Sequence, residues 1–287
     1  MWRRAKIAKK RFRRIIDLAM VVLLISSLAA GHALAGSFDD GGLLRLINRW
    51  ETLPKDYVPE EMILPEVDTN KAGQKESIYM VPCAAAALEE MFSAAEEDGY
   101  ILLAVSGYRS YSTQSLLFKN KVDSVGSRET AQKTVAPPGA SEHQSGLAMD
   151  VVSTNFRYLN RDFLNTPEGK WVARNCCYFG FIVRYRDGWT KVTGCNPEPW
   201  HIRYIGVEHS VAVTRLDIPY ETYAAKARTL PEYVLSWGTS ELFYGLVGDM
   251  LRGDETNAEE LRRAEEMDED IRWETLDRIT ALYDSWD

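Results

Sequence analysis

The chain has 287 residues, 45% of them hydrophobic and 26% charged, which is enough to bury one sizeable core with appendages. Its charge is unevenly placed. The first 35 residues carry eight basic side chains and one acidic one, and that net charge of +7 leaves −15 on the rest of a chain whose total is −8. A nucleic-acid-binding protein shows the opposite balance in its folded part, so the charge distribution excludes that class.

The first 35 residues have the three parts of a secretory signal. A basic stretch is followed by an apolar run over residues 15–30 and then by Ala33-Leu34-Ala35, which is an A-x-A cleavage site. We expect cleavage after Ala35. The alternative is an uncleaved signal anchor, because the apolar run is only slightly shorter than a bilayer span. Under either interpretation the rest of the chain lies outside the cytoplasm, secreted or held at the outer face of the cytoplasmic membrane.

Residues 36–80 are expected to form an extended leading segment. Residues 43–47 (LLRLI) suit a short strand, whereas residues 53–59 (LPKDYVP) hold too much proline for a helix and are expected to lie along the surface. The next unit, residues 81–228, contains most of the helix and strand signals and is predicted to be the functional domain.

The domain is predicted to begin with a helix over residues 82–98. Pro82 suits the first turn of a helix, and Gly99 can adopt the left-handed conformation that ends one. The following elements are, in order, a buried strand (101–105), a turn (106–110), a helix to about residue 121 and a polar loop (122–140).

The second half of the domain supplies three more strands, predicted over residues 148–152, 181–185 and 200–204. Between them, Thr166 can cap a helix that has Pro167 at its first position and runs to about residue 177. The turn at residues 186–189 predicts a hairpin. Because helices and strands do not alternate regularly, we predict an α+β fold with a small antiparallel sheet flanked by helices.

The C-terminal extension, residues 229–287, has a different character. Residues 254–287 hold 13 acidic residues and four arginines. Apolar residues recur there at three-residue spacing, which suits one face of an amphipathic helix: Trp273, Leu276, Ile279 and Leu282. This acidic helical tail can pack on the domain or on a partner, but we favour a solvated acidic face for most of it.

The four cysteines are Cys83, Cys176, Cys177 and Cys195. They contain no C-x-x-C pair, so a cysteine metal site is not expected. In an exported protein, a disulfide can join Cys176 or Cys177 to Cys195. The alternative is that all four are small buried hydrophobic side chains.

Two short segments combine residue types that bind metals: SEHQSGLAMD (141–150) and EPWHIR (198–203). Catalytic zinc usually takes three protein ligands and leaves one position open, and His143, Asp150 and His201 would supply two nitrogens and one oxygen. Gly146 allows the chain to turn between the first two. A carboxylate on a buried strand is costly unless it is paired or binds a metal, and a histidine on a neighbouring strand removes that cost. The competing interpretation is an ordinary hydrogen-bonded His–Asp pair.

Glu198 lies three residues before His201, and Pro199 favours an extended conformation there. From that position its carboxylate can take a proton from water without binding the metal.

Other residues near these segments are assigned to structure. Arg203 is expected to share the strand face of His201 and to orient the site. Trp200 is expected to point to the other face into the core, and Met149 is also assigned to the core. His209 is assigned to structure or to the surface.

The pattern S-x-H-x-x-G-x-A-x-D followed by E-P-W-H-x-R resembles the VanY-like zinc D-alanyl-D-alanine and L,D-carboxypeptidases. Residues 106–111 with Gln114, residues 53–59 and residues 178–181 also resemble segments of this family, in consistent order over about residues 43–225. Five fixed positions in the first pattern alone recur by chance in about one window in a million.

This resemblance implies a Hedgehog/DD-peptidase-like fold with the zinc site on the sheet. It implies three Zn²⁺ ligands: His143, Asp150 and His201. It also implies that Glu198 is the general base and that Arg109 binds the substrate or the developing oxyanion. Gln114 and Ser141 would contact the terminal carboxylate of the peptide.

The implied activity is removal of the terminal D-alanine from peptidoglycan stem peptides by a monomer, with no nucleic-acid partner. One alternative is an L,D-carboxypeptidase that acts on tetrapeptide stems. Another, from a different class, is a peptidoglycan-binding module without turnover. Such a module would not need Glu198.

Overall fold

The computed structural model describes residues 42–70 and 78–228. Its centre is a four-stranded antiparallel sheet with the strand order β1-β2-β4-β3. The strands are β1 (Leu102–Ser106), β2 (Ala148–Ser153), β3 (Phe181–Tyr185) and β4 (Glu198–Tyr204). The α-helices are α2 (Pro82–Glu97), α3 (Tyr111–Val125), α4 (Arg128–Ala131), α5 (Pro167–Asn175), α6 (Thr190–Thr193), α7 (Val207–Leu216) and α8 (Tyr220–Ala227). Short 3₁₀ turns are η3 (Glu142–Ser145), η4 (Arg161–Asn165) and η5 (Cys176–Phe179). The predicted α+β fold with a small antiparallel sheet is confirmed.

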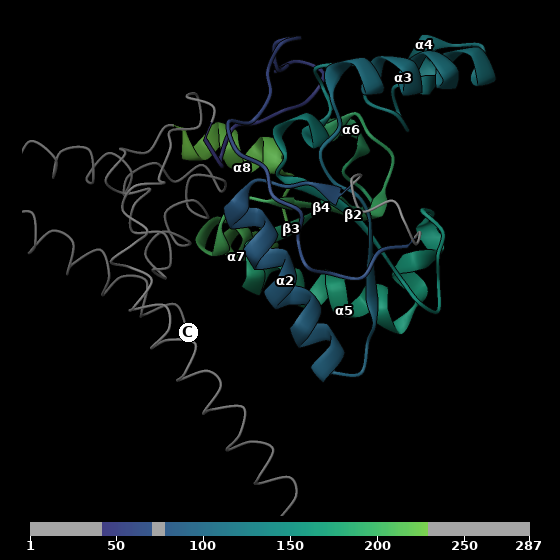
Figure 1. Cartoon of the computed structure of the whole chain (residues 1–287). Coiled ribbons are helices and arrows are strands. Elements are labelled where there is room, and N and C mark those ends of the chain that lie inside the picture. The colour runs from purple at the N-terminus through teal and green to yellow at the C-terminus, as the bar shows by residue number, and fades with distance from the viewer. Residues whose placement is uncertain (1–41, 71–77, 229–287) are drawn as a thin grey trace, which may run out of the picture.

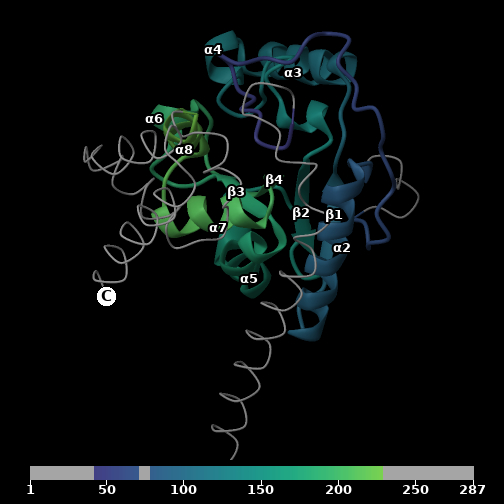
Figure 2. The ribbon, with the colours of Figure 1, turned by 90° about the vertical axis from the view of Figure 1, so that its left-hand side faces the viewer.

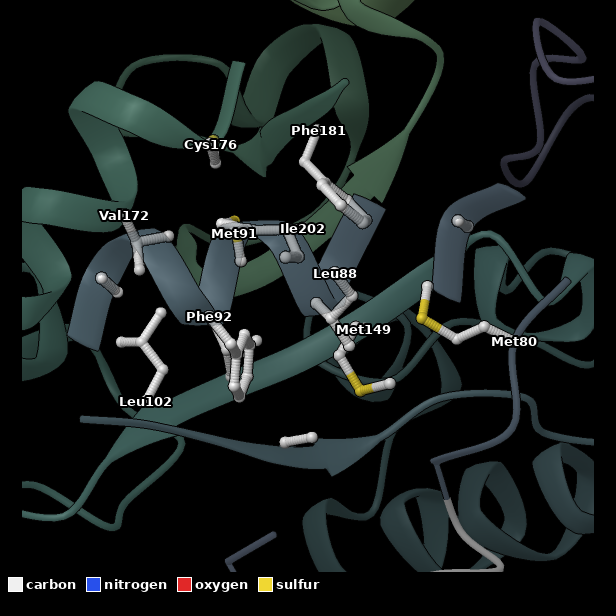
Figure 3. Packing of buried hydrophobic residues seen from close by; sticks show 14 of the residues in the cluster. Met80, Leu88, Met91, Phe92, Leu102, Met149, Val172, Cys176, Phe181 and Ile202 are labelled. Carbon is white, nitrogen blue, oxygen red and sulfur yellow. The ribbon is translucent and has the colours of Figure 1, made fainter. Parts of the chain in front are cut away.

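One face of the sheet carries the hydrophobic core. Met149 of β2 and Ile202 of β4 are fully buried there, against Leu88 and Met91 of α2 and Phe181 of β3 (Figure 3). Burying one such side chain contributes about 1.5–3 kcal/mol relative to leaving it exposed, so this face provides much of the driving force for folding. The assignment of Met149 to the core is confirmed.

The opposite face of the same strands is polar and also buried. Side chains alternate between the faces of a strand, so Asp150, His201 and Arg203 point away from the core. In Figures 1 and 2, α5 and α7 lie on one side of the strands, whereas α3, α6 and α8 lie on the other. The sheet therefore separates a hydrophobic layer from a layer of buried charges, as the shared face predicted for His201 and Arg203 requires.

The helices follow their capping signals. Helix α2 has Pro82 in its first turn, and Gly99 follows it with φ 87°. Helix α3 is capped by Ser110 and continues to Gly126, whose φ is 72°. The loop predicted over residues 122–140 was therefore placed too early, and it also contains α4, which Ser127 caps.

Two further local predictions are wrong. Residues 43–47 do not form a strand, because their main-chain carbonyls accept hydrogen bonds from the side chains of Arg203 and Tyr220. The turn at residues 186–189 does not close a tight hairpin, because α6 follows it. Strands β3 and β4 nevertheless pair antiparallel, as expected.

The predicted signal segment (1–35) and the acidic tail (229–287) lie outside the described residues. Among residues 42–70 and 78–228, no helix combines the length and the apolar character needed to cross a bilayer.

Candidate active site

The three predicted metal ligands come together from three elements. His143 lies in the η3 turn, and Asp150 of β2 is the direct cross-strand partner of His201 on β4. Their ligand atoms all lie within 4.8 Å of one another, and all three residues are buried. Gly146 ends η3 with φ 70°, a left-handed conformation that lets the chain reverse from His143 into β2. The structure thus brings the predicted set together.

In each histidine, one ring nitrogen faces Asp150 and the other contacts a different oxygen atom. His143 Nδ1 lies 2.8 Å from the Gly107 carbonyl oxygen, which leaves Nε2 facing Asp150. His201 Nδ1 lies 3.0 Å from Asp150 Oδ1, and its Nε2 lies 3.3 Å from Glu142 Oε2. An outer partner that accepts the second N–H fixes the tautomer and the ring orientation of a ligating histidine. Both rings are therefore oriented before any ligand arrives.

The charges around these groups favour a bound cation. Burial alone would lower the pKa of His201, but hydrogen bonds to Asp150 and Glu142 outweigh it and raise the pKa to about 9. Burial would raise the pKa of Asp150, yet the adjacent His143 and His201 hold that pKa well below its usual range. In the protein alone a proton on His201 supplies positive charge beside the buried Asp150 carboxylate. A metal ion can supply it instead.

Glu198 reaches the same pocket at a point where the register between β3 and β4 shifts. Val183 pairs with Ile202, but Tyr185 pairs with Glu198, so β4 has two more residues than β3 in this interval. Residues three apart on a regular strand point to opposite faces, and the register shift lets Glu198 and His201 line one pocket.

The pKa of the Glu198 carboxyl is suited to proton transfer. Burial, with a smaller contribution from the negative charge of Asp150, raises the pKa to about 7, although His201 and Arg109 act in the opposite direction. A group whose pKa lies near the working pH can both accept and return a proton.

Arg109 is held in a fixed orientation beside the predicted metal ligands. Its Nη1 donates to Gln114 Oε1 at 2.8 Å and its Nη2 to Ser106 Oγ at 3.1 Å, and Nη2 lies 3.7 Å from Asp150 Oδ2. Burial lowers the pKa of Arg109, whereas Asp150 and Glu198 oppose that effect. The guanidinium lines the pocket with little freedom to move.

The pocket around these groups has a volume of about 480 Å³ and also contains Gln114 and Ser141. The Gln114 amide is engaged at both ends, because its Nε2 donates to the Ala136 carbonyl at 2.6 Å while its Oε1 accepts from Arg109. Its side chain therefore orients Arg109. Ser141 is buried and precedes η3 at the pocket wall.

Two site residues were missed from the sequence. Glu142 is fully buried and contacts His201, and the signal was its position inside the S-x-H pattern. Tyr185 lines the pocket with its ring centroid 5.2 Å from that of His201, and no local pattern marks it. Trp200 was expected only in the core; it packs partly on the core and also lines the pocket.

The remaining candidates behave as structural residues. His209 is buried, and its Nδ1 lies 2.6 Å from the Tyr223 hydroxyl. All four cysteines are free thiols, so the disulfide to Cys195 does not form in this structure.

The family model of VanY, D-alanyl-D-alanine carboxypeptidase, matches residues 77–207. Putative carboxypeptidase YodJ of Bacillus subtilis is 41% identical over 189 residues, which cover 66% of this chain and 69% of that protein. A D-alanyl-D-alanine carboxypeptidase of Enterococcus faecium is 36% identical over 187 residues, which cover 63% of this chain and 57% of that protein.

Solved structures agree. The LdcB LD-carboxypeptidase superposes with a TM-score of 0.61 at 40% identity over 65% of this chain and 87% of that one. VanYB in complex with D-alanine-D-alanine gives a TM-score of 0.54 at 29% identity over 64% of this chain and 97% of that one. A mutant of the D,D-pentapeptidase VanY in complex with Zn(II) gives 0.53 at 29% identity over 63% of this chain and 98% of that one. The resemblance expected from the sequence is confirmed, and the chain belongs to the VanY family of D-alanyl-D-alanine carboxypeptidases.

Proposed function

We propose that this protein is a zinc-dependent D-alanyl-D-alanine carboxypeptidase that removes the terminal D-alanine from peptidoglycan stem peptides. One observation carries the proposal: the His143–Asp150–His201 donor set, Glu198 and Arg109 all line the same pocket. They supply a metal site, a proton acceptor and an anion-binding group, which metal-assisted hydrolysis at a free C-terminus requires.

The donor set fits zinc. Two imidazole nitrogens and one carboxylate oxygen are common ligands of catalytic zinc, and both histidines have the outer partners that such ligands use. The VanY structure in complex with Zn(II) supports the same cofactor. When bound, zinc supplies a Lewis acid that polarises the scissile carbonyl and makes water more acidic.

The side chains of this chain then perform two tasks. Glu198 takes a proton from the attacking water and returns it to the leaving amine, which its pKa of about 7 permits near neutral pH. Arg109 faces the pocket as a pre-oriented cation and stabilises negative charge on the substrate, either the terminal carboxylate or the developing oxyanion. Ser141 adds a hydroxyl for the carboxylate, whereas Gln114 acts by orienting Arg109.

An L,D-carboxypeptidase acting on tetrapeptide stems is the second candidate. The LdcB LD-carboxypeptidase has 40% identity and a TM-score of 0.61, against 29% and 0.54 for VanYB with D-alanine-D-alanine. Both reactions release D-alanine and use the same site. They differ in the residue before the cut bond, so the choice of stem peptide separates them.

We further propose that the protein acts outside the cytoplasm, with residues 1–35 as the export signal or membrane anchor and residues 81–228 as the catalytic domain. The basic and apolar pattern of the N-terminal segment supports export. A monomer is sufficient, because one chain supplies every group named in the pocket.

The test measures the release of D-alanine from purified muramyl pentapeptide and from purified muramyl tetrapeptide by mass spectrometry. We expect release from pentapeptide, its loss after treatment with a chelator and its return on addition of zinc. Release from tetrapeptide alone would transfer the assignment to the L,D activity. A zinc-loaded protein that releases D-alanine from neither peptide would contradict the carboxypeptidase proposal and favour a binding module.

A further inference from the structure

Four buried charged side chains form a connected cluster beneath the metal site. This charge cluster consists of Glu142 in η3, Arg184 on β3, Arg203 on β4 and Glu221 on α8. Glu142 Oε1 accepts from Arg184 Nε at 2.8 Å and from Arg203 Nη1 at 3.1 Å. Arg184 extends both Nη groups to Glu221, at 2.6 and 3.0 Å. The first three side chains are fully buried, and that of Glu221 is 10% exposed.

Within the described chain, Glu142 is the member of the cluster that contacts a proposed metal ligand. Glu142 uses Oε1 for the two arginines and keeps Oε2 for His201 Nε2, at 3.3 Å. With a metal on Nδ1, the remaining N–H of His201 on Nε2 would be donated to Glu142, and this contact would orient the ring. The position of the Glu142 carboxylate therefore decides which nitrogen of His201 faces the metal.

Charge balance makes every member of the cluster necessary. Two carboxylates and two guanidinium groups sum to zero. Removing one partner of a buried ion pair leaves an uncompensated charge and is strongly destabilising to the arrangement. Without Glu221, Arg184 would lose its bidentate partner and Glu142 would be the carboxylate left to compensate two guanidinium groups. The Glu142 carboxylate would then move toward the arginines and away from His201.

The distal part of the cluster lies outside the segment that matches the family model. Residues 77–207 match that model, whereas Glu221 is on α8. The ring of the neighbouring Tyr220 lies beneath both guanidinium groups, with its centroid 5.5 Å from Arg184 Cζ and 5.9 Å from Arg203 Cζ. The Tyr220 hydroxyl donates a hydrogen bond to the Leu44 carbonyl. Helix α8 and the leading segment thus enclose the cluster together.

We infer that Glu142 is the positioning residue for His201, and that Glu221 on α8 sets zinc affinity from a distance by fixing Glu142 through Arg184. The inference rests on the zinc site proposed above. It makes α8 part of the metal centre, although within the described chain its Glu221 contacts Arg184 rather than a metal ligand.

The test is the zinc dissociation constant of the metal-free full chain, measured by competition with a chromogenic chelator well below the melting temperature. Outer partners of metal ligands typically change affinity 10–100-fold, so we expect Glu221→Gln and Glu142→Gln each to weaken zinc binding by about 10-fold or more. Because Glu221 acts through Glu142, Glu221→Gln should add little to the loss in a Glu142→Gln background.

The matched control is Glu51→Gln. Glu51 makes a two-point ion pair with Arg228, directly after α8, and among the described residues its side-chain carboxylate does not contact the charge cluster. Its main-chain groups share a partner, Asn48, with Glu221. Zinc affinity should stay within about twofold of wild type in this variant if general loosening of α8 is not the cause. If Glu221→Gln fails to fold, Glu221→Asp, which keeps the charge but shortens the reach, replaces it.

A folded Glu221 variant with wild-type zinc affinity would overturn the inference, as would fully additive losses in the double variant. An equal loss in Glu51→Gln would also overturn it. Failure of the wild type to bind zinc would instead reject the proposed function, so the two failures are distinguishable.

Discussion

Replacing Glu198 with glutamine should inactivate the enzyme and stabilise its metal-free fold. Burial raises the pKa of this carboxyl from its ordinary value of 4.5 to about 7, so the folded state holds the proton more tightly than the unfolded chain does. The fold is therefore penalised as pH rises from about 4.5 through about 7, when the buried group ionises. Linkage between proton binding and folding gives a loss of unfolding free energy of at most about 3 kcal/mol when Glu198 ionises. The residual exposure of Glu198 reduces this loss.

The assay is denaturant unfolding of metal-free wild type and Glu198→Gln at pH 4.5 and pH 8. The neutral amide does not titrate, so the two proteins should have similar unfolding free energies at the lower pH. At pH 8 the variant should be more stable by about 1–3 kcal/mol. Comparing the difference between the proteins removes the contributions of groups common to both.

The catalytic rate of Glu198→Gln should fall, although its metal-free fold becomes more stable. A positioned general base typically contributes 10²–10⁴-fold, so kcat should fall by about that factor while zinc remains bound. Equal stability of the two proteins at pH 8, or turnover retained in the variant, would refute the role derived for Glu198.

Two further predictions concern charge at Arg109 and His209. Arg109→Lys should reduce kcat/KM by about 10-fold or more in steady-state assays, because an ammonium cannot reproduce the two-nitrogen geometry held by Gln114 and Ser106; unchanged kinetics would show that Arg109 is only a nearby charge. Burial lowers the pKa of His209 to about 4, so the stability that its neutral form provides is complete above about pH 6.5 and is lost as pH falls through about 4. Between pH 7 and pH 4, His209→Gln should therefore lose less unfolding free energy than wild type, by up to about 3 kcal/mol, as measured by denaturant titration. Equal losses in the two proteins would contradict this prediction.

The sequence predicted the parts of the site that depend on short spacing. His143 and Asp150 are separated by a turn, and Glu198 and His201 lie on one strand. Each pair can therefore be recognised from a short stretch of sequence. Asp150 and His201 lie close together because their strands are neighbours in the sheet. Hydrophobic patterning in the sequence predicted the positions of both strands to within a few residues.

The support of the site could not be predicted in the same way. The charge of Glu142 is balanced by Arg184 and Arg203, which lie 42 and 61 residues away in the chain, and no local signal reports such a pairing. The register shift that places Glu198 in the pocket is likewise a property of the pairing between β3 and β4. Residues 43–47 looked like a strand because an apolar run does not reveal which donors its carbonyls meet.

The placement of the pocket across the sheet from the core has a consequence for how this protein can change. Cys195, Asn196 and Pro197 line the pocket from the connection before β4, and Leu159 and Arg161 line it from the segment after β2, whereas the folding core lies across the sheet. Substitutions in these two segments can reshape the wall of the pocket without disturbing Met149 or its neighbours. Natural selection can therefore vary the shape of the pocket at small thermodynamic risk, because this part of its lining and the hydrophobic core lie on opposite sides of the same four strands.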